Sequence, residues 1–435
     1  MVKKIGLLLI SIFVLSSVAM AAGKSETAKP RKAEIKIIWW GSQTRHEGTI
    51  KVIELYKKTH PNVDITYEFS SWADYWTKVT TMAAGGQLPD VMQQDYARIA
   101  EWVKRGLHVQ LDEYVTKKII DTTNIEPSLI DTGRIDGKLW AINLGSNSHS
   151  MILDADMFKK AGIPLPPKDW TWEDFEKIAL QLREKLGIYG YGVHMWNDQI
   201  WKAIYISRGE WIYAPDNKSI GYKDDTPFIQ YLEMMKRLVK AGAMTPRQEE
   251  ISQYAGGTQP EQTPIIFGKA AMQHQWSNQL SAVDKASGGK RNFVLYPLPR
   301  VKGGKSANYI KASQYFSVSS QSKFPEEAAR FIGFFTNDID ANKILMAERG
   351  VPISSKVREA LLPLLPPVQK EVFSFVEYIS KTGSPCPPPD APRHGELINN
   401  LYQPEVVDKV LFDIIDPVTA AKILRERGNA ILSKN

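Results

Sequence analysis

The chain has 435 residues, of which 43% are hydrophobic and 24% charged, and it carries a formal net charge of +7. This length suits two lobes with substantial cores, and the hydrophobic content excludes a mainly disordered chain. The positive charge is spread along the sequence without the basic stripe that nucleic-acid binding requires, so nucleic acid is not an expected partner. The single cysteine, Cys386, excludes an intrachain disulfide.

The amino terminus has the pattern of a secretory signal peptide over residues 1–21. Two lysines precede an apolar run over residues 5–18, and Ala-Met-Ala at 19–21 supplies small residues for cleavage. The alternative, a membrane anchor, is disfavoured because the run is shorter than the ~18–20 residues of a transmembrane helix. Residues 22–33 are expected to form a flexible lead-in. The pattern therefore predicts a periplasmic or secreted protein.

The first part of the mature chain alternates predicted strands and helices. They follow one another as strand 35–40, helix 47–59, strand 63–69, helix 72–84, strand 91–95 and helix 96–105. Units of these lengths indicate a doubly wound α/β arrangement with a parallel sheet. The ligand of such a sheet lies off the carboxyl ends of its strands. Those ends carry aromatic residues, amides and one carboxylate, which favours a neutral, polyhydroxylated ligand.

The middle of the chain contains a turn, a connection and a well-bounded helix. The Asp-Gly pair at 136–137 predicts a hairpin. The small, polar run at 143–150 is interpreted as the first crossing between lobes, with an ordinary surface loop as the alternative. Thr171 and Asp174 have the spacing of a capping box, which predicts a helix over 172–186.

Periodicity predicts the remaining elements up to the carboxyl terminus. Strands are expected at 189–195, 292–299 and 309–319, and helices at 200–208, 226–241, 325–335, 357–365, 368–379 and 404–429. The strand at 309–319 is expected to return the chain to the first lobe. The final helices are expected to close the second lobe.

Four short motifs together carry a resemblance to a known family. They are Trp39-Trp40-Gly41, His60-Pro61-Asn62-Val63, the turn from Gly85 to Val91 and the run from Leu107 to Leu111. In their order and spacing they resemble extracellular solute-binding protein family 1, and within it the carbohydrate-binding components of ABC importers that are similar to maltose-binding protein. Many members carry a lipid-anchored cysteine directly after the signal peptide. Here the sequence reads Ala-Ala-Gly-Lys at 21–24, so a free protein is expected.

The resemblance implies an α/β fold of the two-lobed periplasmic-binding-protein class (type II), with three hinge crossings. Each lobe would be a sheet flanked by helices. Lobe 1 is expected to comprise residues 34–146 and 309–350, and lobe 2 residues 147–308 and 351–435. The third crossing is expected at 347–352. The family's mode of action implies that a ligand binds between the lobes and closes the hinge.

Twelve tryptophans offer flat apolar faces on which sugar rings can stack. Four of them lie where the predicted strands and loops form the edge of the cleft: Trp40, Trp72, Trp196 and Trp276. Four others lie within apolar patterns and are expected in the core: Trp39, Trp76, Trp102 and Trp140. At least two of the first group are expected to contact the ligand.

Polar side chains near the same loops would bind the hydroxyls of a sugar. This set comprises Gln43, Arg45, His46, Asp95, Tyr96, Asn147, His194, Asn197, Gln275 and Tyr315, of which His46 is expected to be a bystander. By resemblance, Gln43 and Arg45 match the family's first ligand loop and His194 a ligand segment of the second lobe. Arg393 falls near a late loop that often adds a ring contact. For Arg45 and Asp95 the alternative role is a surface ion pair.

Catalysis is not expected. Glycoside hydrolysis needs two carboxylates facing each other across the sugar, whereas the predicted cleft loops offer essentially Asp95 alone. The seven histidines show no metal-ligand spacing, and no Gly-x-Ser-x-Gly motif is present. No cofactor and no metal are therefore predicted. A non-sugar ligand such as a polyamine would need several cleft carboxylates, which the predicted cleft loops do not supply.

The sequence thus predicts a monomeric protein that binds an oligosaccharide between two lobes and delivers it to the permease subunits of an ABC importer. A secreted carbohydrate-active enzyme, either a glycosidase or a lyase, is the alternative. The two hypotheses differ in whether the bound sugar is recovered intact.

Overall fold

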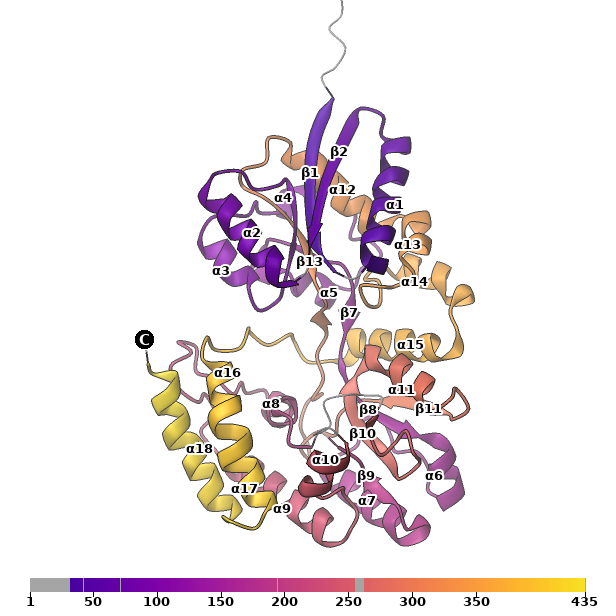
Figure 1. Ribbon diagram of the computed structural model, residues 1–435, viewed down its shortest axis with the longest axis vertical. Helices are drawn as coiled ribbons and strands as arrows, with labels where there is room; N and C mark the ends of the chain where they lie inside the picture. Colours follow the sequence, from indigo (N-terminus) through magenta and orange to yellow (C-terminus); the bar gives the residue numbers. More distant parts are fainter. Residues whose placement is uncertain (1–31, 42, 71, 194, 255–261, 435) are drawn as a thin grey trace, which may run out of the picture.

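Two lobes follow one another along the long axis of the computed structural model, which describes residues 32–434 except 42, 71, 194 and 255–261 (Figure 1). The predicted signal peptide over 1–21 lies outside the described residues, as does the lead-in up to residue 31. Within the described ranges, no helix combines the length and the apolar character needed to cross a membrane.

Lobe 1, the upper lobe in Figure 1, is built on a five-stranded sheet in the order β2-β1-β3-β13-β6. Its strands are β1 (Ala33–Trp40), β2 (Val63–Ser70), β3 (Val91–Gln94), β6 (Ile142–Asn143) and β13 (Tyr315–Val318). The strand β1 pairs in parallel with β2 and β3, as predicted, whereas β13 is antiparallel to β3 and β6. The accompanying helices are α1 (Gln43–Thr59), α2 (Trp72–Ala84), α3 (Ile99–Lys104), α4 (Asp112–Thr116), α5 (Pro127–Asp131), α12 (Pro325–Asn337) and α13 (Ile339–Leu345).

Helices cover both faces of the lobe 1 sheet, which explains why β1 is apolar at nearly every position. Ile37 and Trp39 point into one core that also contains residues of α1 and α12. Ile38 and Trp40 point to the opposite face and pack against α2 and α3. A strand buried on both sides reads as a continuous hydrophobic run rather than an alternating one.

Lobe 2 is built on a four-stranded sheet in the order β11-β8-β10-β9. Its strands are β8 (His149–Asp154), β9 (Tyr189–Tyr191), β10 (Ala270–Trp276) and β11 (Phe293–Tyr296). The central strand β8 is antiparallel to both β10 and β11. Its helices include α6 (Ala155–Ala161), α7 (Trp172–Leu186), α8 (Asp198–Ser207), α9 (Thr226–Lys240), α10 (Arg247–Gln253), α11 (Leu280–Ala286) and α15 (Pro367–Thr382).

The helix α7 has the limits that the sequence predicts. The Thr171 hydroxyl accepts from the Asp174 backbone N–H, and the Asp174 carboxylate accepts from the Thr171 backbone in return. At the other end Gly187 adopts φ 69°, a left-handed conformation that glycine reaches without strain. This helix packs on the lobe 2 sheet through Phe175, Ala179 and other buried residues.

The segments that connect the lobes lie side by side. The strand β7 (Ser146–Asn147) pairs antiparallel with β12 (Lys311–Ala312), and Ser146 also bridges to Val351. The strand predicted over 309–319 is therefore two strands, β12 in this hinge and β13 in the lobe 1 sheet. At Gly145 an added Cβ would lie 2.1 Å from the Arg349 carbonyl oxygen, so the segments approach more closely than a side chain allows.

The chain stays with lobe 1 beyond the expected boundary at residue 350, which corrects the predicted third crossing. The helix α14 (Ser355–Leu361) packs against α13, and Arg358 pairs with Glu126 at 2.9 Å. Lobe 2 is reached only at α15, which contacts both lobes. Its Glu371 accepts from the Leu295 backbone, whereas Ser128 of lobe 1 donates to its Ser380 carbonyl. Apolar periodicity does not show which lobe an amphipathic helix covers.

The tail also differs from the prediction of one helix over 404–429. It forms α16 (His394–Leu397), a π-helical segment (Ile398–Val407), α17 (Asp408–Leu411) and α18 (Pro417–Leu432). Asp413 adopts φ 58° in the break, and the Asp416 side chain caps α18 ahead of Pro417. Proline is favoured in the first turn of a helix, so this pair starts a new helix. In Figure 1 these helices lie side by side at the edge of lobe 2.

Candidate ligand-binding site

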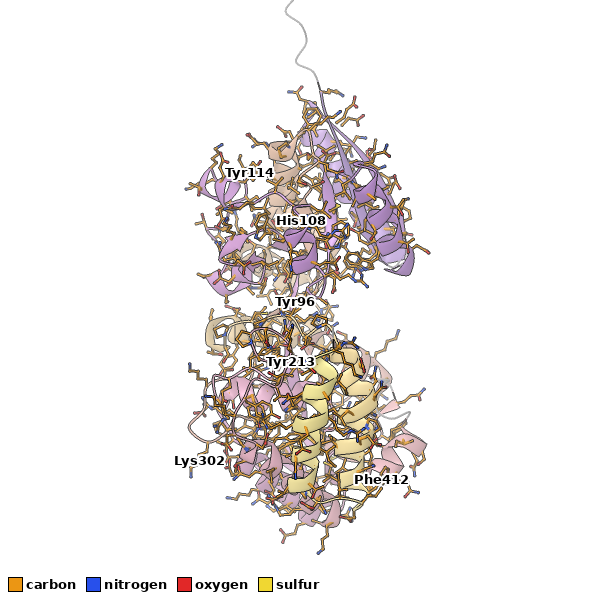
Figure 2. The ribbon with its side chains drawn as sticks, turned by 90° about the vertical axis from the view of Figure 1, so that its left-hand side faces the viewer. Tyr96, His108, Tyr114, Tyr213, Lys302 and Phe412 are labelled. Atoms are coloured by element: carbon orange, nitrogen blue, oxygen red, sulfur yellow. The ribbon has the colours of Figure 1, made fainter. Side chains whose placement is uncertain are left out.

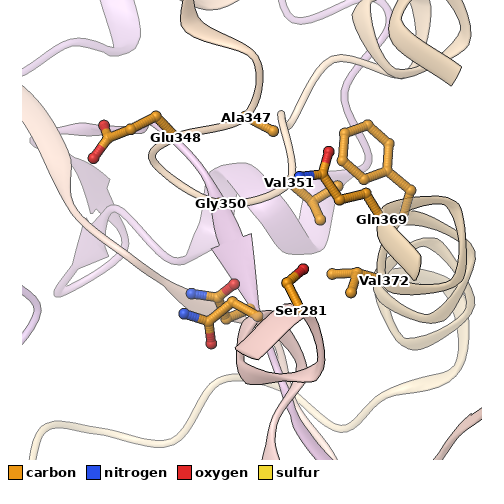
Figure 3. A pocket seen from close by; sticks show the side chains of 10 residues that line it. Ser281, Ala347, Glu348, Gly350, Val351, Gln369 and Val372 are labelled. Atoms are coloured by element: carbon orange, nitrogen blue, oxygen red, sulfur yellow. The ribbon is translucent and has the colours of Figure 1, made fainter. Parts of the chain in front are cut away.

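Three neighbouring cavities follow the boundary between the lobes. The first encloses about 320 Å³ and is lined by Tyr96 and Ala97 of lobe 1, by Tyr309 and Lys311 of the connection, and by Gln199, Lys202, Trp211, Trp276, Asp390 and His394 of lobe 2, among others. The second, of about 240 Å³, shares Trp276 and Lys311 with the first. The third, of about 230 Å³, shares Asn147 and Asn278 with the second and reaches Glu348 and Gly350 (Figure 3). Both lobes and the hinge thus contribute lining residues to these cavities, and each cavity shares residues with its neighbour.

Trp276 lies at the centre of this site, at the end of β10. Its ring centroid is 3.5 Å from that of His149 on the neighbouring strand β8. His149 is buried, and its ring nitrogen Nδ1 lies 3.0 Å from Nε2 of His274. Burial, with the neighbouring His274, holds the pKa of His149 well below its usual range, so this ring is neutral behind the indole. The arrangement holds Trp276 as a fixed apolar wall.

A buried charged cluster forms the wall of the first cavity beside α8. The Lys202 ammonium lies 2.8 Å from carboxylate oxygens of both Asp198 and Asp390, and only 3% of its side chain is exposed. His394 Nε2 is 3.3 Å from Asp198, and its Nδ1 is 2.5 Å from the Tyr213 hydroxyl. Burial opposes ionisation of Asp198, but Lys202 and His394 together outweigh burial and hold the pKa of this carboxyl below its usual range. In this cluster, two carboxylates share one buried ammonium.

Tyr96 joins the two lobes next to the first cavity. It follows β3 in lobe 1, and its hydroxyl donates to the Pro387 carbonyl in the segment between α15 and α16. The Cys386 sulfur lies 3.6 Å from the same hydroxyl. Burial raises the pKa of the Cys386 thiol to about 11, which makes it a poor nucleophile at neutral pH. Figure 2 shows Tyr96 at the neck between the lobes, with Tyr213 below it.

Three of the predicted site residues line the cavities: Tyr96, Asn147 and Trp276. The Asn147 amide nitrogen donates to Ser313 at 2.8 Å, while its carbonyl oxygen has no protein partner among the described residues. Three predicted residues lie outside the described side chains. These are Gln43, Trp72 and His194.

Trp40 and Tyr315 are placed in the interior, contrary to the expected ligand contacts. Trp40 is 7% exposed and packs edge-on against Tyr75. Tyr315 is fully buried, and its hydroxyl donates to the Thr132 carbonyl at 2.7 Å. Both residues lie near strand ends, but the helices that cover the sheet also cover these side chains.

Arg45 and Asp95 each have a partner of their own within lobe 1. Arg45 Nε is 2.9 Å from a Glu348 oxygen, and both side chains are largely buried. The pair is therefore not a surface ion pair, and it ties the start of α1 to the third cavity through Glu348. The Asp95 carboxylate accepts from the Ala97 backbone N–H at 2.9 Å, which shapes the turn before α3.

The remaining predicted residues in lobe 2 support local structure. The Trp196 indole donates to Glu250 at 2.6 Å, with the Arg247 guanidinium 4.7 Å from its ring. Asn197 caps α8 by accepting from the Gln199 backbone. Arg393 donates to the Lys434 carbonyl and to Glu396, beside the end of α18.

Sequence reasoning missed much of the site. The unpredicted lining residues are Lys202, Trp211, Asn278, Tyr309, Lys311 and Asp390, among others. A signal for the charged cluster was present, because Asp198 and Lys202 have the i, i+4 spacing of a helical ion pair. Within the described ranges, no three histidine, cysteine or acidic residues are grouped so that they could hold a metal ion.

Comparison with known proteins assigns this fold to a class. A family model described as bacterial extracellular solute-binding protein matches residues 40–341. The chain belongs to this family, which confirms the resemblance carried by its motifs. The chain spans about half the length of curated relatives such as a putative binding protein of Brucella abortus, with 23% identity over 202 residues that cover 45% of this chain and 47% of the relative.

One solved structure supports the same assignment, and a second shares the fold. A family 1 extracellular solute-binding protein from Alicyclobacillus acidocaldarius is 27% identical, with a TM-score of 0.83 and coverage of 94% of this chain and 100% of that one. A periplasmic oligogalacturonide binding protein from Yersinia enterocolitica is 23% identical, with a TM-score of 0.75 and coverage of 92% and 99%. The second likeness concerns the fold alone.

Proposed function

We propose that the protein binds an oligosaccharide between its lobes and delivers it to an ABC importer. The observation that carries this proposal is the line of cavities bounded by both lobes and the hinge strands. Its walls combine the rings of Trp276, Trp211 and Tyr96 with the amides of Asn147 and Asn278. Aromatic faces suit the C–H faces of sugar rings, and amides can both donate to and accept from hydroxyls.

The joint length of the cavities favours a ligand of more than one ring. Their lining residues run from Glu348 in lobe 1 past the hinge to His394 in lobe 2. The Yersinia enterocolitica protein, which shares the fold, is described as binding an oligogalacturonide. This supports a sugar as the ligand class and leaves its identity to experiment.

A ligand that touches both lobes favours the state in which they are close together. Such bridging contacts shift an existing equilibrium between open and closed forms. The closed protein then docks on the permease subunits, as the family's role implies. A monomer located in the periplasm or secreted, after loss of residues 1–21, fits this role.

Binding without turnover is favoured over glycoside hydrolysis by the carboxylates of the site. Among the described residues that line the first cavity, Asp390 is the only acid, and it is paired with Lys202. Glu348, which lines the third cavity, is paired with Arg45. Asp198 contacts the same ammonium and therefore lies on the same wall. A glycosidase needs its two carboxyl groups on opposite sides of the scissile bond.

The test is a calorimetric titration of the purified protein against a panel of neutral and acidic oligosaccharides, with chromatography of each mixture after incubation. We expect saturable binding of at least one sugar that is recovered intact. Recovery of cleaved sugar would instead favour the carbohydrate-active enzyme. Failure of every sugar to bind would overturn the carbohydrate proposal.

A further inference from the structure

Lys311 occupies a central position in the site. It begins the hinge strand β12, where its backbone pairs with Asn147, and its side chain lines both the first and the second cavity. Its ammonium lies 5.3 Å from the ring centroid of Trp276 and 5.9 Å from that of Tyr96. The charge is thus held between an aromatic residue of each lobe.

Lys311 differs from the other lysine of the site in having no carboxylate partner. Lys202 is neutralised by Asp198 and Asp390, each at 2.8 Å. Within the described part of the chain, no acidic side chain forms an ion pair with Lys311. It is also the one charged side chain among the residues that line the second cavity. Lys311 is therefore the ammonium of the site that has no carboxylate within ion-pair distance among the described residues.

Closure of the lobes around a ligand would remove water from this ammonium. A desolvated charge is costly unless it gains a partner of opposite charge or strong hydrogen bonds. A neutral sugar supplies only hydroxyls, whereas an anionic sugar supplies a charge-assisted acceptor. The surrounding groups in the second cavity, Asn278, Gln279 and Ser313, are neutral and would not repel an anion.

We infer that the oligosaccharide carries carboxylates, as in a uronic acid, and that Lys311 binds one of them while the sugar ring stacks on Trp276. This inference rests on the proposed function, because it names the chemical class of sugar at the same site. The amides of Asn278 and Gln279 lie in the same cavity and would take the ring hydroxyls.

The experiment compares uronic-acid trisaccharides of several linkages with their carboxyl-reduced counterparts, in which each carboxylate becomes a neutral hydroxymethyl group. Sulfated trisaccharides form a third arm. For the unaltered protein, at least one uronic-acid ligand is expected to bind about tenfold or more tighter than its reduced form, since hydrogen bonds to charged groups contribute at this scale.

The variants locate that preference. Lys311→Met is expected to abolish the difference in affinity between acidic and reduced ligands, and Lys311→Arg is expected to retain that difference. Lys302→Met is the matched control, because Lys302 is exposed on the outer side of lobe 2, far from the neck (Figure 2). Melting temperatures of all three variants check that the fold is retained.

Each outcome decides a separate point. Equal or tighter binding of the reduced sugars would overturn the inference and leave the proposed function standing. If Lys311→Met still binds acidic sugars more tightly than reduced ones, the role of Lys311 is overturned. If only the sulfated sugars bind more tightly than the reduced ones, the inference that the anionic group is a carboxylate is overturned. If neither acidic nor neutral sugars bind, the proposed function fails together with the inference.

Discussion

At the scale of single residues, the tryptophans divide by what surrounds them. Trp276 is partly exposed in two cavities and backed by a buried histidine. Trp102 is 2% exposed and packs in the lobe 1 core, 6.1 Å from Trp76 between ring centroids. The same type of side chain thus lines a cavity in one place and packs in the core in another.

Replacing these two tryptophans should separate affinity from stability. Trp276→Ala is expected to weaken binding of the oligosaccharide by about 2 kcal/mol, roughly thirtyfold, because a large aromatic contact is lost. Its melting temperature should change little. Trp102→Ala should cost about 3–5 kcal/mol of stability, since it leaves a large cavity. Calorimetric titration and urea unfolding of both variants make the comparison, and a stable Trp102→Ala would contradict the core assignment.

His108 gives lobe 1 a dependence on pH. Burial lowers its pKa from 6.5 to about 3. The folded state therefore holds a neutral ring, whereas the unfolded chain takes up a proton below about pH 6.5. Its contribution to stability is complete above that pH and is lost as the pH falls towards 3.

The expected slope is about 1.4 kcal/mol of unfolding free energy per pH unit for this one histidine below pH 6.5. Urea unfolding at pH 7.5 and 5.5 measures this pH dependence, and the variant His108→Leu removes the titrating imidazole. Burial also lowers the pKa of His149. The contribution of His149 to the pH dependence is therefore the same in the unaltered protein and in His108→Leu. An unchanged slope in His108→Leu would show that His108 does not titrate in this way.

Part of the site could be predicted at this scale and part could not. Trp276 and Tyr96 follow strands whose ends were expected at the cleft, so their positions were accessible from the pattern. The pairing of Lys202 with Asp390 joins residues 188 positions apart, and no local signal relates them. Trp40, like Trp276, lies at the end of a strand, where a cleft residue is expected. Only the packing of α2 against β1 shows that Trp40 is covered.

At the scale of elements, the hinge depends on close contact between its segments. An added Cβ at Gly145 would lie 2.1 Å from the Arg349 carbonyl oxygen and 3.0 Å from the Gly350 nitrogen, so backbone atoms would have to move. At Gly395, in α16, an added Cβ would meet no heavy atom within 4 Å. The two glycines offer a matched pair for testing the hinge.

We expect Gly145→Ala to lower the free energy of unfolding by about 1–3 kcal/mol, the usual cost of overpacking. Gly395→Ala should be neutral or stabilising by up to about 1 kcal/mol, because alanine is the better helix former. Thermal and urea unfolding measure both. Equal stability of the two variants would contradict the close approach of the hinge segments.

The elements that were predicted well are those with local end signals. The helices α2 and α7 have the predicted limits, with a Gly-Gly turn after the first and a capping box before the second. The tail was predicted as one helix because apolar periodicity continues across the break at 412–416. The placement of α14 on lobe 1 depends on tertiary contacts such as Arg358 with Glu126, 232 residues away, which no local pattern contains.

At the scale of the whole molecule, the lobes are linked by the paired hinge strands and by α15. Because β7 pairs with β12 and also bridges to Val351 of lobe 1, rotation at either hinge strand involves these neighbouring segments. The contact between Tyr96 and Pro387 adds a further link next to the first cavity. A ligand in this region touches both lobes, which is the condition for coupling binding to closure.

The most direct test of this account is small-angle X-ray scattering of the protein with and without the oligosaccharide that binds most tightly in the titrations. If the lobes close on the ligand, the radius of gyration becomes smaller at saturation, and the sugar is recovered intact from the sample. Trp276→Ala, at a sugar concentration too low to saturate it, should scatter like the free protein. An unchanged radius of gyration with the site fully occupied would contradict ligand binding by closure of the two lobes.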